Sequence, residues 1–214
     1  MTISRGVVAA GILLAAGIGL VSFTETRIGR NEVNRLAEML TLHEGMTVAE
    51  VGAGRGWLSV EVAKRVGTSG HLYATDLDPT RLEDIRKAVR GASLVNVTVL
   101  QAGERSTNLP EGCCEAVFMR RVYHHLSDPF AVTASIHDAL KPGGRLVIIE
   151  FKPDGVVGLV TRMGLDRAVV VERVSAVGFR AVRVEAWPGW DHYVAMFEKP
   201  AGPGAAATSS HVTR

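Results

Sequence analysis

The chain has 214 residues, of which 47% are hydrophobic and 21% are charged. This length and composition are typical of one globular domain with a hydrophobic core of its own. The formal net charge is only +2, and no basic stripe interleaved with aromatic residues is present, which argues against a nucleic acid partner. We therefore expect the partner to be a small molecule.

The first feature along the chain is an uncharged, apolar run at residues 6–23. At about 1.5 Å per residue it reaches roughly 27 Å as a helix, close to the thickness of a bilayer core. No clean small-x-small cleavage site follows it, which favours an uncleaved membrane anchor over a cleaved signal peptide or a buried helix. Arg5 precedes the run, and Arg27, Arg30 and Arg35 follow it, which favours a domain that faces the cytoplasm. Residues 1–24 are thus predicted to be a membrane anchor or signal segment, with export through a cleaved signal peptide as the alternative.

An amphipathic helix is expected next. Asn31 can cap this helix, which we expect to end near residues 44–45. Its apolar positions follow the helical period and are Val33, Leu36, Ala37 and Leu40. We expect it to lie beside the ligand cleft as a lid, and simple coverage of a sheet is the alternative.

A short apolar run at residues 48–51 then predicts a buried strand. It leads through three alternating glycines, Gly52, Gly54 and Gly56, into a helix with inward positions Leu58, Val62, Ala63 and Val66. Glycine lets the backbone turn tightly and approach a ligand, and the helix behind presents free N–H groups. This strand, turn and helix predict a ligand site.

The residues around the turn indicate which ligand it binds. Trp57 stands where a dinucleotide fingerprint needs a small residue, which disfavours a nicotinamide or flavin cofactor, and the Gly-Lys-Ser/Thr ending of a P-loop is missing. Glu50 would repel a pyrophosphate but suits a ligand with a cationic amino group. Residues 50–56 read Glu-Val-Gly-Ala-Gly-Arg-Gly, which resembles the acid-x-Gly-x-Gly-x-Gly signature of the class I S-adenosylmethionine-dependent methyltransferases. The resemblance implies that S-adenosyl-L-methionine is bound by Glu50, Gly52, Ala53, Gly54 and Gly56.

The second strand, at residues 71–75, ends at Asp76. A carboxylate at the tip of this strand is placed to accept hydrogen bonds from both hydroxyls of a ribose. Helix entry is the alternative role, but Asp78 and Pro79 already fit the cap and first turn of the next helix. We therefore predict that Asp76 binds the ribose and that Leu77 lies beside the adenine.

A third strand at residues 97–100 leads into a polar loop at residues 101–110. In the family resembled, an acid directly after a glycine here contacts the adenine amino group, which makes Glu104 the candidate; a solvated surface charge is the alternative. Cys113 and Cys114 are the only cysteines. Adjacent cysteines bridge poorly and lack zinc-ligand spacing, so reduced thiols and no metal site are expected.

A fourth strand at residues 116–119 precedes a segment that faces the same cleft, because ligands bind beyond the carboxyl ends of such strands. Residues 122–129 read Val-Tyr-His-His-Leu-Ser-Asp-Pro. Together with Leu-Pro at residues 109–110, they resemble small bacterial class I methyltransferases of the ubiquinone-biosynthesis-like, methyltransferase type 11-like kind. Arg120 is a candidate for the methionyl carboxylate or an anionic substrate. If the acceptor is a hydroxyl, the candidate bases are Tyr123, His124 and His125, although at least one histidine is expected merely to link the loop to the sheet.

The remaining elements follow the same family. They are a helix at 130–140, a Lys-Pro-Gly-Gly stop at 141–144, a strand at 145–151, an irregular stretch at 152–164, a helix at 166–177 and an antiparallel hairpin at 180–186 and 193–198. The final residues, 201–214, are predicted to be disordered.

The resemblance implies an α/β fold: a Rossmann-like, doubly wound sheet of seven strands in the order 3-2-1-4-5-7-6, with strand 7 antiparallel, preceded by an N-terminal apolar helix. Residues 25–200 would form the methyltransferase domain. The expected function is S-adenosylmethionine-dependent methyl transfer to a small acceptor, and an anchor at residues 6–23 suggests a lipid-like one. A non-catalytic S-adenosylmethionine-binding module is the alternative, and a nicotinamide-dependent reductase is a weaker one.

Overall fold

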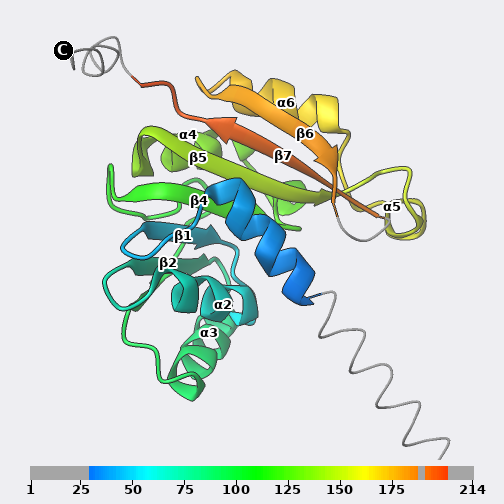
Figure 1. Cartoon of the computed structure of the whole chain (residues 1–214). Coiled ribbons are helices and arrows are strands. Elements are labelled where there is room, and N and C mark those ends of the chain that lie inside the picture. The colour runs from blue at the N-terminus through cyan, green and yellow to red at the C-terminus, as the bar shows by residue number, and fades with distance from the viewer. Residues whose placement is uncertain (1–28, 188–190, 202–214) are drawn as a thin grey trace, which may run out of the picture.

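The computed structural model describes residues 29–187 and 191–201 (Figure 1). The predicted membrane or signal segment at residues 1–24 and nearly all of the predicted disordered tail lie outside this range. Within the described residues, no helix is long and apolar enough to cross a bilayer.

The seven strands form one sheet in the predicted order, β3-β2-β1-β4-β5-β7-β6. Their bounds are β1 Thr47–Val51, β2 His71–Asp76, β3 Val97–Gln101, β4 Cys114–Arg120, β5 Leu140–Phe151, β6 Arg180–Ala186 and β7 His192–Glu198. Strands β1 to β5 pair in parallel, and β7 is antiparallel to both β5 and β6, as predicted. The chain order reverses between β1 and β4, which is where ligands bind in open α/β sheets.

Helices cover both faces of the sheet (Figure 1). The helical segment at 29–40, α2 (Trp57–Val66) and α3 (Pro79–Gly91) pack on one face. On the other face lie α4 (Pro129–Ala139) and α6 (Arg167–Ser175). The inward positions predicted for α2 are all buried, because they form one stripe of a 3.6-residue period.

Three local predictions are wrong. The first helix is already formed at residue 29 and ends at Leu40, so Asn31 lies inside it and caps nothing. The stretch expected to be irregular contains a short helix, α5 (Val156–Thr161). The Lys-Pro-Gly-Gly stretch at 141–144 belongs to β5, because Leu140 already pairs with Cys114 of β4.

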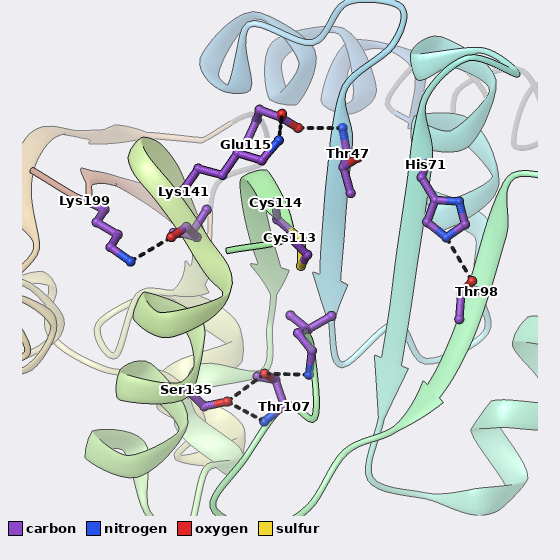
Figure 2. Close-up of a disulfide and its surroundings, with 12 residues drawn as sticks. Thr47, His71, Thr98, Thr107, Cys113, Cys114, Glu115, Ser135, Lys141 and Lys199 are labelled. Atoms are coloured by element: carbon purple, nitrogen blue, oxygen red, sulfur yellow. Dashed lines mark hydrogen bonds and ion pairs between the residues drawn. A yellow bond between two sulfur atoms is a disulfide. The ribbon is translucent and has the colours of Figure 1, made fainter. Parts of the chain in front are cut away.

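The expectation of two reduced thiols is also wrong. Cys113 and Cys114 form a disulfide across a Cα–Cα distance of 3.8 Å. The Cα–Cα distance of most disulfides is at least about 4.4 Å, which is why adjacent cysteines were not expected to form one. The bond lies where the chain enters β4 (Figure 2). Nearby, Glu115 accepts a hydrogen bond from the Thr47 N–H at 2.7 Å and pairs with Lys141. The disulfide therefore belongs to the amino-terminal edge of the sheet, opposite the carboxyl ends of the parallel strands.

Candidate functional site

The glycine turn after β1 has the left-handed backbone that its sequence predicts. The φ angles of Gly52, Gly54 and Gly56 are 75°, 56° and 76°. A Cβ on Gly52 would overlap the Val122 side chain, and one on Gly56 would lie 3.0 Å from the Ile85 Cα. A Cβ on Gly54 would meet nothing within 4 Å. The outer two glycines thus permit close packing, and the middle one faces open space.

The turn is fastened to the end of β2. The N–H groups of Gly52 and Ala53 donate to the Thr75 carbonyl at 2.8 and 2.9 Å, and Ala53 is buried. The Gly54 N–H donates to Oδ2 of Asp76 at 2.9 Å, and the Asp78 N–H donates to Oδ1 at 3.0 Å. A carboxylate has about four acceptor sites, so Asp76 keeps capacity on both oxygens for two further donors.

A cavity of about 240 Å³ opens beside this turn. Its walls come from the carboxyl ends of β1 and β2, the loops after β3 and β4, and α4. It brings together five residues predicted from the sequence: Gly52, Asp76, Leu77, Glu104 and His125. Its lining does not include the other predicted residues, which are Glu50, Ala53, Gly54, Gly56, Arg120, Tyr123 and His124.

The sequence did not predict the other residues that line the cavity. These are Val51, Ala102, Gly103, Ser106, Thr107, Val122, Leu126, Ser127 and Val132. An ion pair between Arg105 and Asp128, 2.8 Å long, joins the two loops beside the cavity. Thr107 is fixed to Ser135 of α4, with 2.8 Å between their hydroxyl oxygens (Figure 2). The sequence contains one signal for Asp128, because an aspartate directly before a proline, here Pro129, is typical of the start of a helix.

Glu50 lies beside the turn in a buried position. The Ser59 hydroxyl on α2 donates to its Oε2. Burial raises the pKa of Glu50 to about 8, even though the bond from Ser59 and the charge of Arg120 lower it. A cation placed against this carboxyl would favour its charged form.

Arg120, at the end of β4, is already paired. Its Nε and Nη2 donate to the two carboxylate oxygens of Glu32 at 2.6 and 3.0 Å. Glu32 lies in the helical segment at 29–40 and also accepts a hydrogen bond from the indole N–H of Trp187 at 3.1 Å. The guanidinium lies 5.4 Å from the ring centroid of Trp57. The first helix therefore contacts the carboxyl edge of the sheet through a partly buried ion pair.

The three candidate bases point to different places. The Tyr123 hydroxyl lies in the core, 3.3 Å from the Thr133 hydroxyl. His124 is nearly buried, and its Nδ1 lies 2.7 Å from Oε1 of Glu150 on β5. His125 lines the cavity, and its pKa is lowered by burial and by the charge of His124. His124 thus makes the loop-to-sheet link that was expected of one histidine.

A second polar pair lies at the same edge and was not predicted. Arg121 has a φ of 60°, and its Nε donates to Nε2 of His192 at 2.7 Å. Burial and the charges of Arg121 and Arg120 lower the pKa of His192 to about 4. Arg121 also lies 5.1 Å from the ring centroid of Phe151. Nothing in the local sequence pattern linked Arg121 to His192, because they are far apart in the chain.

The residues present fit an adenosine-type ligand with an amino acid end. The cavity offers the apolar side chain of Leu77 and a carboxylate with spare acceptors at Asp76, and the glycine turn beside it leaves open space over Gly54. Glu50 and Arg120 do not line this cavity, and they lie close enough to one another for the charge of Arg120 to lower the pKa of Glu50. This sheet order, acid-glycine turn and second-strand acid together define the class I methyltransferase fold.

The comparisons with known proteins agree. Residues 48–144 match the family model described as "Methyltransferase domain". A solved S-adenosylmethionine-dependent methyltransferase from Aquifex aeolicus superposes with a TM-score of 0.73 and 24% identity, over 81% of this chain and 97% of that one. Residues 48–144 therefore match a methyltransferase domain, and the described chain has the fold of a solved S-adenosylmethionine-dependent methyltransferase.

Two curated relatives differ in their acceptors. The protein-L-isoaspartate O-methyltransferase of Methanothermobacter thermautotrophicus is 30% identical over 70% of this chain and 62% of its own length. The ubiquinone/menaquinone biosynthesis C-methyltransferase UbiE of Enterobacter sp. (strain 638) is 26% identical over 56% of this chain and 50% of its own length. The chain thus spans about half to three fifths of the length of these relatives.

Proposed function

We propose that this protein transfers a methyl group from S-adenosylmethionine to a small, lipid-soluble acceptor. The observation that carries the proposal is the cavity beside the glycine turn, in which Asp76, Leu77 and Glu104 meet. Asp76 would accept hydrogen bonds from the ribose hydroxyls, and Leu77 and Glu104 would flank the adenine. Glu50 and Arg120 would hold the amino acid end.

When bound, S-adenosylmethionine supplies a methyl group that its positive sulfur already activates. The task left to the chain is mainly to align the acceptor with that methyl group, which lowers the barrier by proximity. The loop after β4 adjoins the cavity and carries His125. This histidine is the side chain best placed to take a proton from an acceptor hydroxyl.

Replacing His125 with glutamine is expected to lower turnover by about 10²-fold or more, the usual contribution of a general base. Because burial lowers the pKa of His125 below its usual value, the neutral form dominates at neutral pH, and wild-type turnover should rise with pH in the acidic range and level off toward neutral pH. Steady-state kinetics across pH, with cofactor affinity measured by calorimetry, test this. His124→Gln is the comparison variant, and undiminished turnover in both variants would rule out a histidine base.

The affinity for S-adenosylmethionine is expected to increase with pH up to about 8. The pKa of Glu50 is about 8 in the free protein, so most Glu50 carboxyls are protonated at neutral pH. A cationic amino group favours the charged carboxylate, so binding releases a proton, and affinity rises by up to about tenfold per pH unit below that pKa. Calorimetry between about pH 6 and pH 8 measures the slope.

Glu50→Gln is the control for that slope. Any titration of the cofactor itself contributes equally to both proteins, so the difference between the two slopes belongs to Glu50. Equal slopes in the wild type and the variant would show that Glu50 does not receive the amino group.

Two further observations support a lipid-soluble acceptor. A relative is named for ubiquinone and menaquinone biosynthesis, and the uncharged run at residues 6–23 is long enough for an anchor. A tether of this kind concentrates an enzyme where lipid-soluble substrates lie.

A non-catalytic S-adenosylmethionine-binding module is the second candidate, favoured by one observation: Arg120 is already engaged by Glu32. Titration of the full chain with S-adenosylmethionine and with NADH, followed by a turnover screen of lipid and quinone-like acceptors, separates the cases. Binding of the first ligand alone supports the cofactor assignment, and turnover supports the enzyme. Binding of NADH alone would overturn both.

A further inference from the structure

An apolar face lies on the outside of α5. Val156, Leu159 and Val160 are 63%, 72% and 80% exposed, and Met163 follows at 38%. The first three are spaced i, i+3 and i+4, so they share one side of the helix. A surface helix normally turns such a stripe toward the core, and α5 does the reverse.

The contacts on the opposite side of α5 explain this orientation. Gly158 is buried, and a Cβ there would overlap the backbone of residues 152–153. The carboxylate of Asp191 accepts hydrogen bonds from the N–H groups of Val156 and Val157 at 2.8 and 2.9 Å. The helix is therefore fastened with its glycine side inward and its apolar side toward solvent.

This apolar face lies at the same edge of the sheet as the candidate site. α5 follows the end of β5, whose neighbour β4 ends at Arg120. The helical segment at 29–40 begins at this edge, where Glu32 pairs with Arg120, and runs to the opposite edge, where the Met39 carbonyl accepts a hydrogen bond from Arg145 (Figure 1). The described part of the chain therefore starts at the carboxyl edge, where α5 also lies.

We propose that the apolar face of α5 (Val156, Leu159, Val160 and Met163) inserts into the surface of a membrane that contains anionic lipids. Interfacial helices bury such side chains at the boundary of headgroups and acyl chains. Arg162 and Arg167 are exposed in the residues that follow α5 and would meet anionic headgroups, and Asp154 and Asp166 are the exposed acids that flank the same helix. The uncharged run at residues 6–23 ends shortly before the segment that begins at this edge, so an anchor there and α5 would engage the same membrane.

This inference rests on the proposed function where it concerns the methyl acceptor. It adds that the acceptor lies in the membrane beside the site. An acceptor that stays in the bilayer would reach the carboxyl ends of β4 and β5 from the side of α5. The lipid contact itself is testable without any knowledge of the acceptor.

The experiment is hydrogen–deuterium exchange of the full chain with and without vesicles of phosphatidylcholine and phosphatidylglycerol. Amides at residues 153–165 are expected to exchange more slowly with vesicles. In the double variant Leu159→Asp/Val160→Asp, the slowing of exchange by vesicles should be at least about tenfold smaller. Two apolar side chains that would be buried in the membrane are replaced there by two negative charges near anionic lipid. The matched control is Val95→Asp, since Val95 is 85% exposed in the loop before β3, at the opposite edge.

Protection in the wild type and Val95→Asp but not in the double variant supports the proposal. Unchanged exchange with vesicles overturns it, and so does vesicle-independent protection that grows with protein concentration, which would indicate a second copy of the chain. Titration of the same samples with S-adenosylmethionine keeps the proposed function separate. A wild type that binds lipid but not the cofactor would contradict that function and leave the lipid contact standing.

Discussion

Replacing Asp76 with alanine is expected to weaken S-adenosylmethionine binding by at least roughly a hundredfold. In the role proposed for Asp76, the variant would lose two charge-assisted hydrogen bonds to the ribose, each contributing about 1.5 kcal/mol or more. It also leaves the Gly54 N–H without its partner, which loosens the glycine turn. Isothermal titration of the full chain measures the loss directly.

Asp78→Ala is the matched control for Asp76→Ala. Asp78 is exposed, caps α3 by accepting from the Thr80 N–H at 2.8 Å and does not line the cavity. Its loss should lower the free energy of unfolding by about 1 kcal/mol and leave the affinity nearly unchanged. If both variants bind the cofactor as tightly as the wild type, the ribose role of Asp76 is wrong.

Glu32→Gln is expected to lower the free energy of unfolding by about 3 to 5 kcal/mol. Only 7% of the Glu32 side chain and 18% of the Arg120 side chain are exposed, so the variant leaves a guanidinium largely buried without its counter-charge. Denaturant unfolding of the full chain measures the change.

The double variant Glu32→Leu/Arg120→Met separates an ion-pair effect from loss of packing. Buried ion pairs replaced by apolar side chains of similar volume are often neutral in stability. We therefore expect the double variant to recover most of the stability lost in Glu32→Gln. A double variant as unstable as the single one would mean that the unpaired charge of Arg120 is not what destabilises Glu32→Gln.

The sequence predicted best where neighbouring residues determine the structure. The strand, glycine turn and helix at residues 48–66 follow from local period and backbone freedom, and Asp76 follows from its place at the end of the next strand. The sequence placed both histidines in the loop after β4, at the edge of the sheet where ligands bind, and His125 lines the cavity there.

Contacts between residues far apart in the chain could not be predicted from local sequence patterns. Glu32 pairs with Arg120 across 88 positions, and Arg121 meets His192 across 71. Such pairs depend on the order of strands and on how each helix crosses the sheet, and no local pattern encodes them. The outward face of α5 was missed for the same reason, because the residue that fastens it, Asp191, comes from the turn before β7.

The contact between Gly52 and Val122 has a consequence for how the two halves of the site behave. Val122 fills the space that a side chain at Gly52 would need, so the loop that carries His125 rests directly on the turn after β1. A displacement of the turn after β1 would therefore displace Val122, and with it the loop that carries His125. The two segments are coupled by direct packing and not only through the strands that precede them.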